Sequence, residues 1–127
     1  MISLQLGYSG ENYLKAILLL HQSQDEVRAV DIAARLDFTK ASVSRMIKNL
    51  SEQGYVTVER GNICLTLEGG RAADRVYGRF LALRQFLTQY LGIMPEIAKL
   101  DAGAMEHFIS DETFEALIKM MNRNGGE

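Results

Sequence analysis

Two short amphipathic segments, joined by a turn at Asp37-Phe38, constrain the fold of this chain more than any other feature. Both segments carry apolar residues along one helix face. They lie three residues apart in the first, at Val30, Ala33 and Leu36, and three or four apart in the second, at Val43, Met46, Ile47 and Leu50. Thr39 precedes the second segment as a suitable N-cap, and Gly54 follows it as a stop. Two helices joined by such a short turn form a helix-turn-helix, the second helix of which can enter the major groove of DNA.

The segment after Gly54 changes from helical to strand-like residues. Tyr55–Val58 and Ile63–Thr66 are rich in residues that favour β-strands, and they flank the turn Arg60-Gly61-Asn62. This pattern predicts a β-hairpin with Arg60 at its tip. A hairpin directly after a helix-turn-helix is a wing, so residues 1–66 are expected to form a winged helix-turn-helix domain.

Residues 67–127 are expected to form a helical dimerisation domain. An apolar seam runs along the stretch from Leu67 to Leu91 and requires a partner helix; its residues, the expected dimer contact, are Val76, Phe80, Leu83, Leu87 and Tyr90. Further helices are expected to begin at Pro95, after Asp101 and after Ser110. The predicted fold class is therefore mostly α with a small β-hairpin.

The composition narrows the class of protein. Hydrophobic residues make up 47% of the chain and charged residues 24%, which is a globular balance. No apolar stretch approaches the roughly 20 residues of a membrane-spanning helix, and no signal peptide is recognisable, so a cytoplasmic protein without a membrane partner is expected. The sequence contains no GxSxG, phosphate-loop or HExxH motif and only one cysteine, Cys64, so we expect no enzyme.

The second helix of the helix-turn-helix carries residues suited to duplex DNA. The net charge of the chain is -2, but residues 35–49 hold four basic residues and one acidic residue. Arg45 and Ser42 are expected at or near base edges, and the other polar side chains at phosphates. The predicted DNA-binding residues are Thr39, Lys40, Ala41, Ser42, Ser44, Arg45, Lys48 and Arg60. The alternatives are an ordinary solvated helix face and a winged-helix protein-interaction module that no longer binds DNA.

Five phrases spread over nearly the whole chain point to one family. They are Glu11-Asn12-Tyr13-Leu14, Asp31-Ile32-Ala33, Ser42-Val43-Ser44, Thr66-Leu67-Glu68-Gly69 and Met105-Glu106-His107-Phe108-Ile109-Ser110-Asp111. Together they resemble the metal-dependent repressors typified by the diphtheria toxin repressor and the manganese transport regulator, in the short form without a third domain. The resemblance implies a homodimeric transcriptional repressor of a palindromic operator, with residues 67–127 sensing a divalent manganese or iron ion.

The sequence departs from this family at the metal site. The resemblance carries over only one pair of metal ligands, Glu106 and His107. The other ligand positions hold Asn12 and Lys15 in the first helix, Phe80 in the long helix, Gly103 before the pair, and Arg84 and Lys99 at the ancillary site. Because a hard divalent ion needs several oxygen or nitrogen donors, we expect a degraded sensor site. The pair then either forms a hydrogen-bonded structural contact or binds manganese or iron with residues not identified.

Overall fold

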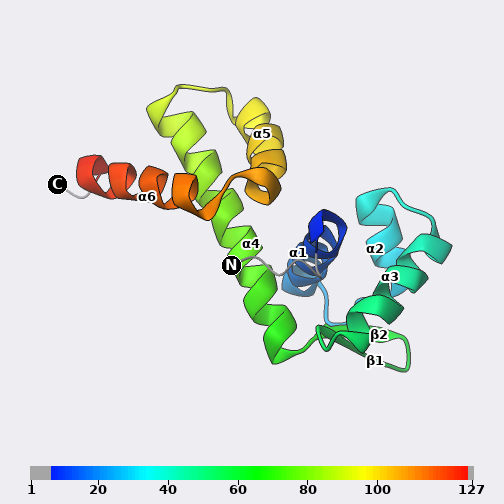
Figure 1. The fold of residues 1–127 in the computed structure, drawn as a ribbon. Coiled ribbons are helices and arrows are strands. Elements are labelled where there is room, and N and C mark those ends of the chain that lie inside the picture. The colour runs from blue at the N-terminus through cyan, green and yellow to red at the C-terminus, as the bar shows by residue number, and fades with distance from the viewer. Residues whose placement is uncertain (1–6, 126–127) are drawn as a thin grey trace. The chain divides into compact units, whose positions relative to one another are not determined.

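The computed structural model describes residues 7–125, and these residues form a mostly helical protein with one two-stranded hairpin (Figure 1). The predicted fold class, a winged helix-turn-helix followed by a helical region, is confirmed. The elements are α1 (Gly7–Ser23), α2 (Ala29–Leu36), α3 (Lys40–Glu52), β1 (Val56–Glu59), β2 (Asn62–Leu65), α4 (Leu67–Gln85), the π-helical segment η1 (Phe86–Tyr90), α5 (Pro95–Phe108) and α6 (Asp111–Gly125). None of the described helices is long and apolar enough to span a membrane.

The chain divides into two compact units within α4, between Arg75 and Val76. In the N-terminal unit, α1, α2, α3 and the hairpin share one core, whose fully buried side chains are Leu14, Ile17, Val27, Ile32, Val43, Leu50 and Val56. Thr39 caps α3 as expected, since its Oγ1 accepts a hydrogen bond from the Ser42 amide at 3.1 Å. Gly54 follows α3 with a φ of +87°, a conformation that glycine adopts without strain.

The hairpin is antiparallel, with Val56 opposite Leu65 and Glu59 opposite Asn62. Asn62, expected in the turn, belongs instead to β2. Only Arg60 and Gly61 lie between the strands, and both have positive φ, which is the geometry of the two-residue type I′ turn.

The connection from the hairpin to α4 explains the phrase from Thr66 to Gly69. The Thr66 hydroxyl accepts a hydrogen bond from the Gly69 amide at 3.0 Å and donates one to the Gly54 carbonyl at 2.6 Å. A side chain at position 69 would collide with the Tyr55 carbonyl. Thr66 therefore caps α4, and Gly69 lets the helix lie against the start of the hairpin.

The C-terminal unit covers the apolar seam of α4 from within the chain. Phe80, Leu83 and Leu87 pack in one cluster with side chains of α5 and α6, namely Ala98, Ala102, Met105, Phe114 and Leu117. Val76 is also buried, and Tyr90 donates a hydrogen bond to the Met121 carbonyl at 3.0 Å. The seam does need partner helices, and α5 and α6 of the same chain supply them for Phe80, Leu83 and Leu87. Tyr90 is half-buried.

Two of the three expected helix starts in this unit are confirmed. Pro95 lies in the first turn of α5, and the Ser110 hydroxyl caps α6 by accepting a hydrogen bond from the Thr113 amide at 3.1 Å. The start after Asp101 is wrong, because α5 continues through it to Phe108. Ala98 and Ala102 are both fully buried, which keeps one face of α5 in the core on both sides of Asp101.

Candidate nucleic-acid interface

Helix α3 separates its side chains into a buried and an exposed face. Val43, Ile47 and Leu50 are buried in the core of the N-terminal unit. Five of the predicted DNA-binding side chains are exposed on the other side, and Ser42 is half-buried; the exposed five are Lys40, Ala41, Ser44, Arg45 and Lys48. Thr39 is exposed at the N-cap, and Arg60 is exposed in the hairpin turn. The structure therefore brings seven of the eight predicted residues together on α3 and its cap.

A chain of hydrogen bonds organises the start of this surface. Thr39 Oγ1 donates to Ser42 Oγ at 2.9 Å, and Arg45 Nη2 donates to the same oxygen at 3.3 Å. Ser42 thus holds the guanidinium of Arg45 along its own helix. An arginine held in this way loses less conformational entropy when it binds, and a guanidinium can make paired hydrogen bonds with a guanine edge.

An aromatic pair lies next to Arg45, and its exposed member was expected only as a turn residue. Phe38 is 45% exposed, and its ring centroid lies 5.9 Å from that of Tyr13, which is 3% exposed. Burial raises the pKa of Tyr13 above its usual value, and the nearby positive charge of Arg45 acts in the opposite direction. Both rings line a cavity of about 390 Å³ with Arg45 and Ser42. An aromatic residue in a two-residue turn was the only sequence signal for this feature.

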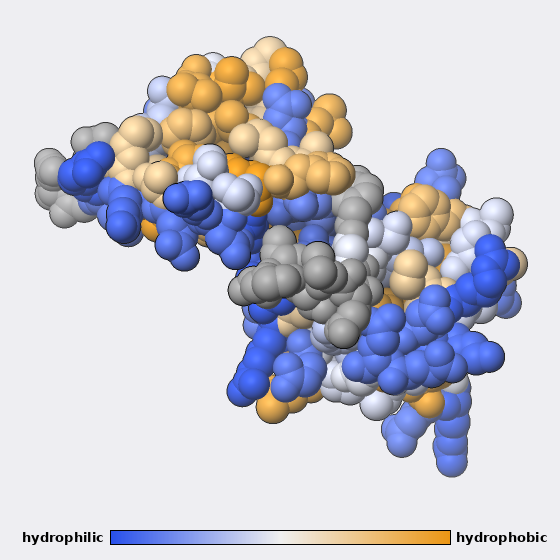
Figure 2. Space-filling view, in the orientation of Figure 1, coloured by the Kyte–Doolittle hydropathy of each residue, from blue (hydrophilic) through white to orange (hydrophobic). Residues whose placement is uncertain are grey.

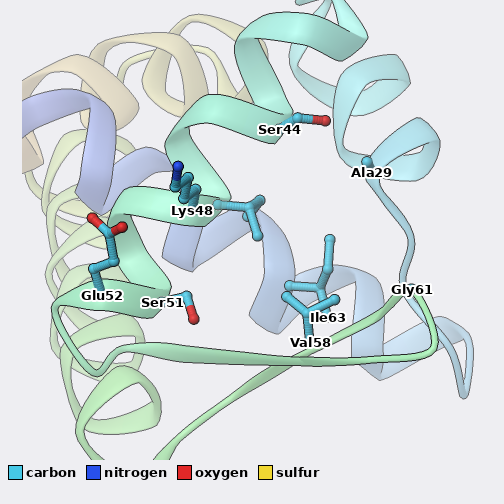
Figure 3. Close-up of a pocket in the computed structure, with 9 residues that line it drawn as sticks. Ala29, Ser44, Lys48, Ser51, Glu52, Val58, Gly61 and Ile63 are labelled. Atoms are coloured by element: carbon cyan, nitrogen blue, oxygen red, sulfur yellow. The ribbon is translucent and has the colours of Figure 1, made fainter.

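A groove separates α3 from the hairpin (Figure 3). It has a volume of about 370 Å³, and its apolar lining consists of Ala29, Ile47, Val58 and Ile63. Ser44 and Lys48, from the exposed face of α3, also line it. The groove is therefore lined both by the exposed face of α3 and by the hairpin, which carries Arg60.

The predicted metal ligands lie in the C-terminal unit, on α5. The side chains of Glu106 and His107 are 0% and 2% exposed, and Glu106 Oε2 lies 3.9 Å from His107 Nε2. Phe80 is buried in the core, and Gly103 lies one turn before the pair on the same helix. Within the described residues, no three His, Cys, Asp or Glu side chains gather in a way that could hold a metal ion.

Arg79 is a buried charged residue that the sequence analysis missed. Its guanidinium donates to Asp111 Oδ1 at 2.8 Å, to the Ile109 carbonyl at 2.6 Å and to the Glu106 carbonyl at 3.3 Å. It also lies 4.7 Å from the centre of the Phe114 ring. Arg79 thereby connects α4 to the end of α5 and the start of α6. No sequence signal marks it, because its partners are 27 to 32 residues away.

Comparison with known protein families accounts for nearly the whole chain. Residues 5–62 match the model of the iron-dependent repressor N-terminal DNA-binding domain, and residues 66–124 match the metal-binding and dimerisation domain of the same repressors. This chain belongs to the iron-dependent repressor family. The family consists of transcriptional repressors rather than enzymes, and α3, β1 and the turn at Arg60-Gly61 lie within the segment that matches its DNA-binding domain.

Two relatives of this chain are described as transcriptional regulators. The transcriptional regulator MntR of Escherichia coli O6:H1 is 34% identical over 118 residues, which cover 92% of this chain and 76% of that protein. An uncharacterized HTH-type transcriptional regulator of Methanocaldococcus jannaschii is 29% identical, over 93% of this chain and 96% of its own length.

Solved structures of other proteins show the same fold. A manganese-dependent transcriptional repressor in complex with manganese aligns with a TM-score of 0.81 at 31% identity, and the IdeR protein of T. acidophilum aligns with a TM-score of 0.79 at 27% identity. Each alignment covers 88% of this chain. The chain spans about half of each solved chain, 52% and 53% respectively.

Proposed function

We propose that this protein binds operator DNA as a homodimer and represses transcription. The observation that carries the proposal is the two-faced character of α3. Lys40, Arg45 and Lys48 are exposed on one face, and the opposite, apolar face is buried. In the major groove, Arg45 would contact a base edge, while Lys40, Ser44 and Lys48 would contact phosphates. Arg60 on the wing would reach a neighbouring phosphate or the minor groove.

Binding to duplex DNA at several salt concentrations tests this proposal. Fluorescence anisotropy with duplexes enriched from a random library should give an affinity that falls steeply as salt rises, because phosphate contacts release counterions. A scrambled duplex of equal length is the control for sequence preference. If no duplex binds in low salt, the chain is instead a winged-helix module for protein interaction.

The homodimer is proposed to form through an apolar surface of the C-terminal unit. Four exposed hydrophobic side chains lie in the connection between η1 and α5 and along the first part of α5: Leu91, Met94, Ile97 and Leu100. Figure 2 shows hydrophobic atoms gathered over this part of the unit. Leu100 is 75% exposed, and exposed apolar patches of this kind mark interaction surfaces. The family description of residues 66–124 as a dimerisation domain supports a second copy as the occupant.

The mass of the protein in solution tests the dimer. The wild type should sediment as a dimer at micromolar concentration, and Leu100→Glu should shift it toward the monomer because a charge would be buried at the interface. Leu67→Glu is the matched control, since Leu67 is also strongly exposed but belongs to the N-terminal unit. Equal masses for wild type and Leu100→Glu would contradict the assignment of this surface to the dimer.

In a dimer, the two copies of α3 would meet half-sites about 34 Å apart on a palindromic operator.

We also infer that DNA binding does not need manganese or iron. Glu106 and His107 supply two donors, and Phe80 and Gly103 supply none from their side chains. Hard divalent ions such as manganese and magnesium prefer about six oxygen-type ligands. Among the described residues, no group of three His, Cys, Asp or Glu side chains is arranged to hold a metal ion, which is consistent with this inference.

A further inference from the structure

The tip of the hairpin has a backbone conformation that its sequence does not favour. Arg60 has a φ of +53° and Gly61 a φ of +83°, as a type I′ turn requires. Glycine suits such a position, but an arginine is strained there because its Cβ crowds the backbone. Residues with this strain persist only where their surroundings hold them, and they gather at functional sites.

The residue that contacts this turn is Arg28, in the segment between α1 and α2. Its Nη1 donates a hydrogen bond to the Arg60 carbonyl at 2.7 Å, and its Nη2 donates to Glu26 Oε1 at 2.8 Å. Its backbone amide donates to Asp31 Oδ2 at 2.8 Å, at the N-terminus of α2. Arg28 is therefore fixed at its backbone by α2 and at its guanidinium by Glu26, with one donor directed at the turn.

Two further hydrogen bonds join the same segment to the hairpin. The Ile63 amide donates to the Val27 carbonyl at 2.7 Å, and the Val27 amide donates to Asn62 Oδ1 at 2.9 Å. Figure 3 shows Gly61, at the tip of the hairpin, beside the start of α2 at Ala29. A Cβ at Gly61 would meet the Arg28 guanidinium, which would have to shift, and the positive φ of Gly61 is what favours glycine there. The segment before α2 thus supports the whole far end of the hairpin.

We propose that Arg28 is a positioning residue for DNA binding, which holds the strained turn so that Arg60 is presented to a DNA phosphate. This rests on the proposed function. The positive charge of Arg28 is paired with Glu26 at 2.8 Å, whereas the side chain of Arg60 is exposed at the tip. Arg28 therefore acts through the turn carbonyl, and Arg60 supplies the charge that meets DNA.

A double-mutant cycle tests this division of roles. Duplex affinity is measured across a salt series for wild type, Arg28→Gln, Arg60→Ala and the double variant. Each single variant should weaken binding roughly fivefold, the scale of one exposed ion pair, and should lower the salt slope by about one. The double variant should bind no more weakly than Arg60→Ala, because Arg28 acts only through Arg60. If the two losses multiply and the slope falls by about two, Arg28 contacts DNA itself and the proposal is wrong.

Further variants separate geometry from charge. Arg28→Lys keeps the charge but loses the guanidinium fork that reaches both the carbonyl and Glu26, so it should bind as weakly as Arg28→Gln. Full rescue by lysine would overturn the proposal. Arg71→Gln, which removes one exposed positive charge from the same unit, is the control and should bind like wild type.

Amide hydrogen exchange without DNA gives a second reading. In Arg28→Lys, the amides of Gly61 and Asn62 should exchange faster while those of α3 keep their protection. Unchanged exchange at the turn would contradict the proposal, and loss of protection throughout would mean that Arg28 serves the fold as a whole.

If wild type binds no duplex, the proposed function fails and this role fails with it. If wild type binds and Arg28→Gln binds equally well, only the role of Arg28 fails.

Discussion

At the scale of single residues, the hydrogen bonds at the start of α3 change the role assigned to one of its polar residues. The sequence placed Ser42 beside Arg45 as a base contact, but the structure commits the Ser42 hydroxyl to Thr39 and to Arg45 itself. Ser42 therefore contacts Arg45, the residue proposed to bind a base edge, and spacing in the sequence does not distinguish this role from direct contact with DNA.

Truncation of Arg45 and truncation of Lys48 should affect DNA binding in different ways. Arg45→Ala should weaken operator binding by roughly 1 to 3 kcal/mol and relax the preference at one base position, because a bidentate base contact is lost. Ser42→Ala should show the same change in preference to a smaller degree. Lys48→Ala should weaken all sequences alike and lower the salt slope by about one. Selection from a random duplex library measures the preference, and an unchanged base preference in Arg45→Ala would rule out the groove contact.

Tyr13 gives a pH dependence with a definite sign. Because burial raises its folded-state pKa above the usual 10.0, the unfolded chain loses the tyrosine proton first as pH rises. This stabilisation is fully present below pH 10 and is lost as pH rises from the unfolded-state pKa through the folded one. Urea unfolding of Tyr13→Phe should therefore show a shallower fall in the free energy of unfolding above pH 10 than wild type. Tyr55→Phe is the control, and equal slopes for Tyr13→Phe and wild type would refute the assignment.

At the scale of elements, Arg79 determines how α4, α5 and α6 pack within the C-terminal unit. Arg79→Met should lower the free energy of unfolding by roughly 2 to 4 kcal/mol, because the carbonyls of Ile109 and Glu106 lose a charged donor. Arg75→Met, at an exposed position one turn earlier on α4, should change it by about 0.5 kcal/mol or less. Denaturant titration measures both, and similar losses for the two variants would contradict the role of Arg79.

The boundaries of the elements followed local signals where such signals exist. Thr39, Gly54, Pro95 and Ser110 act on amides or dihedral angles within a few residues, so each could be predicted from its neighbours. The helix start predicted after Asp101 was wrong because an aspartate is also tolerated inside a helix, provided that the residues around it keep one face of the helix buried. Whether a capping residue caps depends on the packing around it.

At the scale of the whole molecule, the proposed loss of the sensor site predicts DNA binding without a metal ion. Chelator-treated protein should bind its operator with the same affinity before and after titration with manganese or ferrous iron. Manganese should also leave the thermal midpoint unchanged, because an ion that binds only the folded state would raise it. A saturable gain in affinity that His107→Ala abolishes would show instead that the site is functional.

The sequence by itself determined the helix-turn-helix, the wing, the family and the outward set of basic residues on α3. These follow from periodicity, caps and short phrases, all of which act over a few residues. Only the tertiary structure decided what covers the seam of α4, what Arg79 binds and how Arg28 supports the turn at Arg60. Each of these is a contact between segments about 15 to 35 residues apart, such as the 32 residues from Arg28 to Arg60. The physical reason is that a residue's spacing along the chain specifies the face it occupies, while packing between distant segments specifies what meets that face.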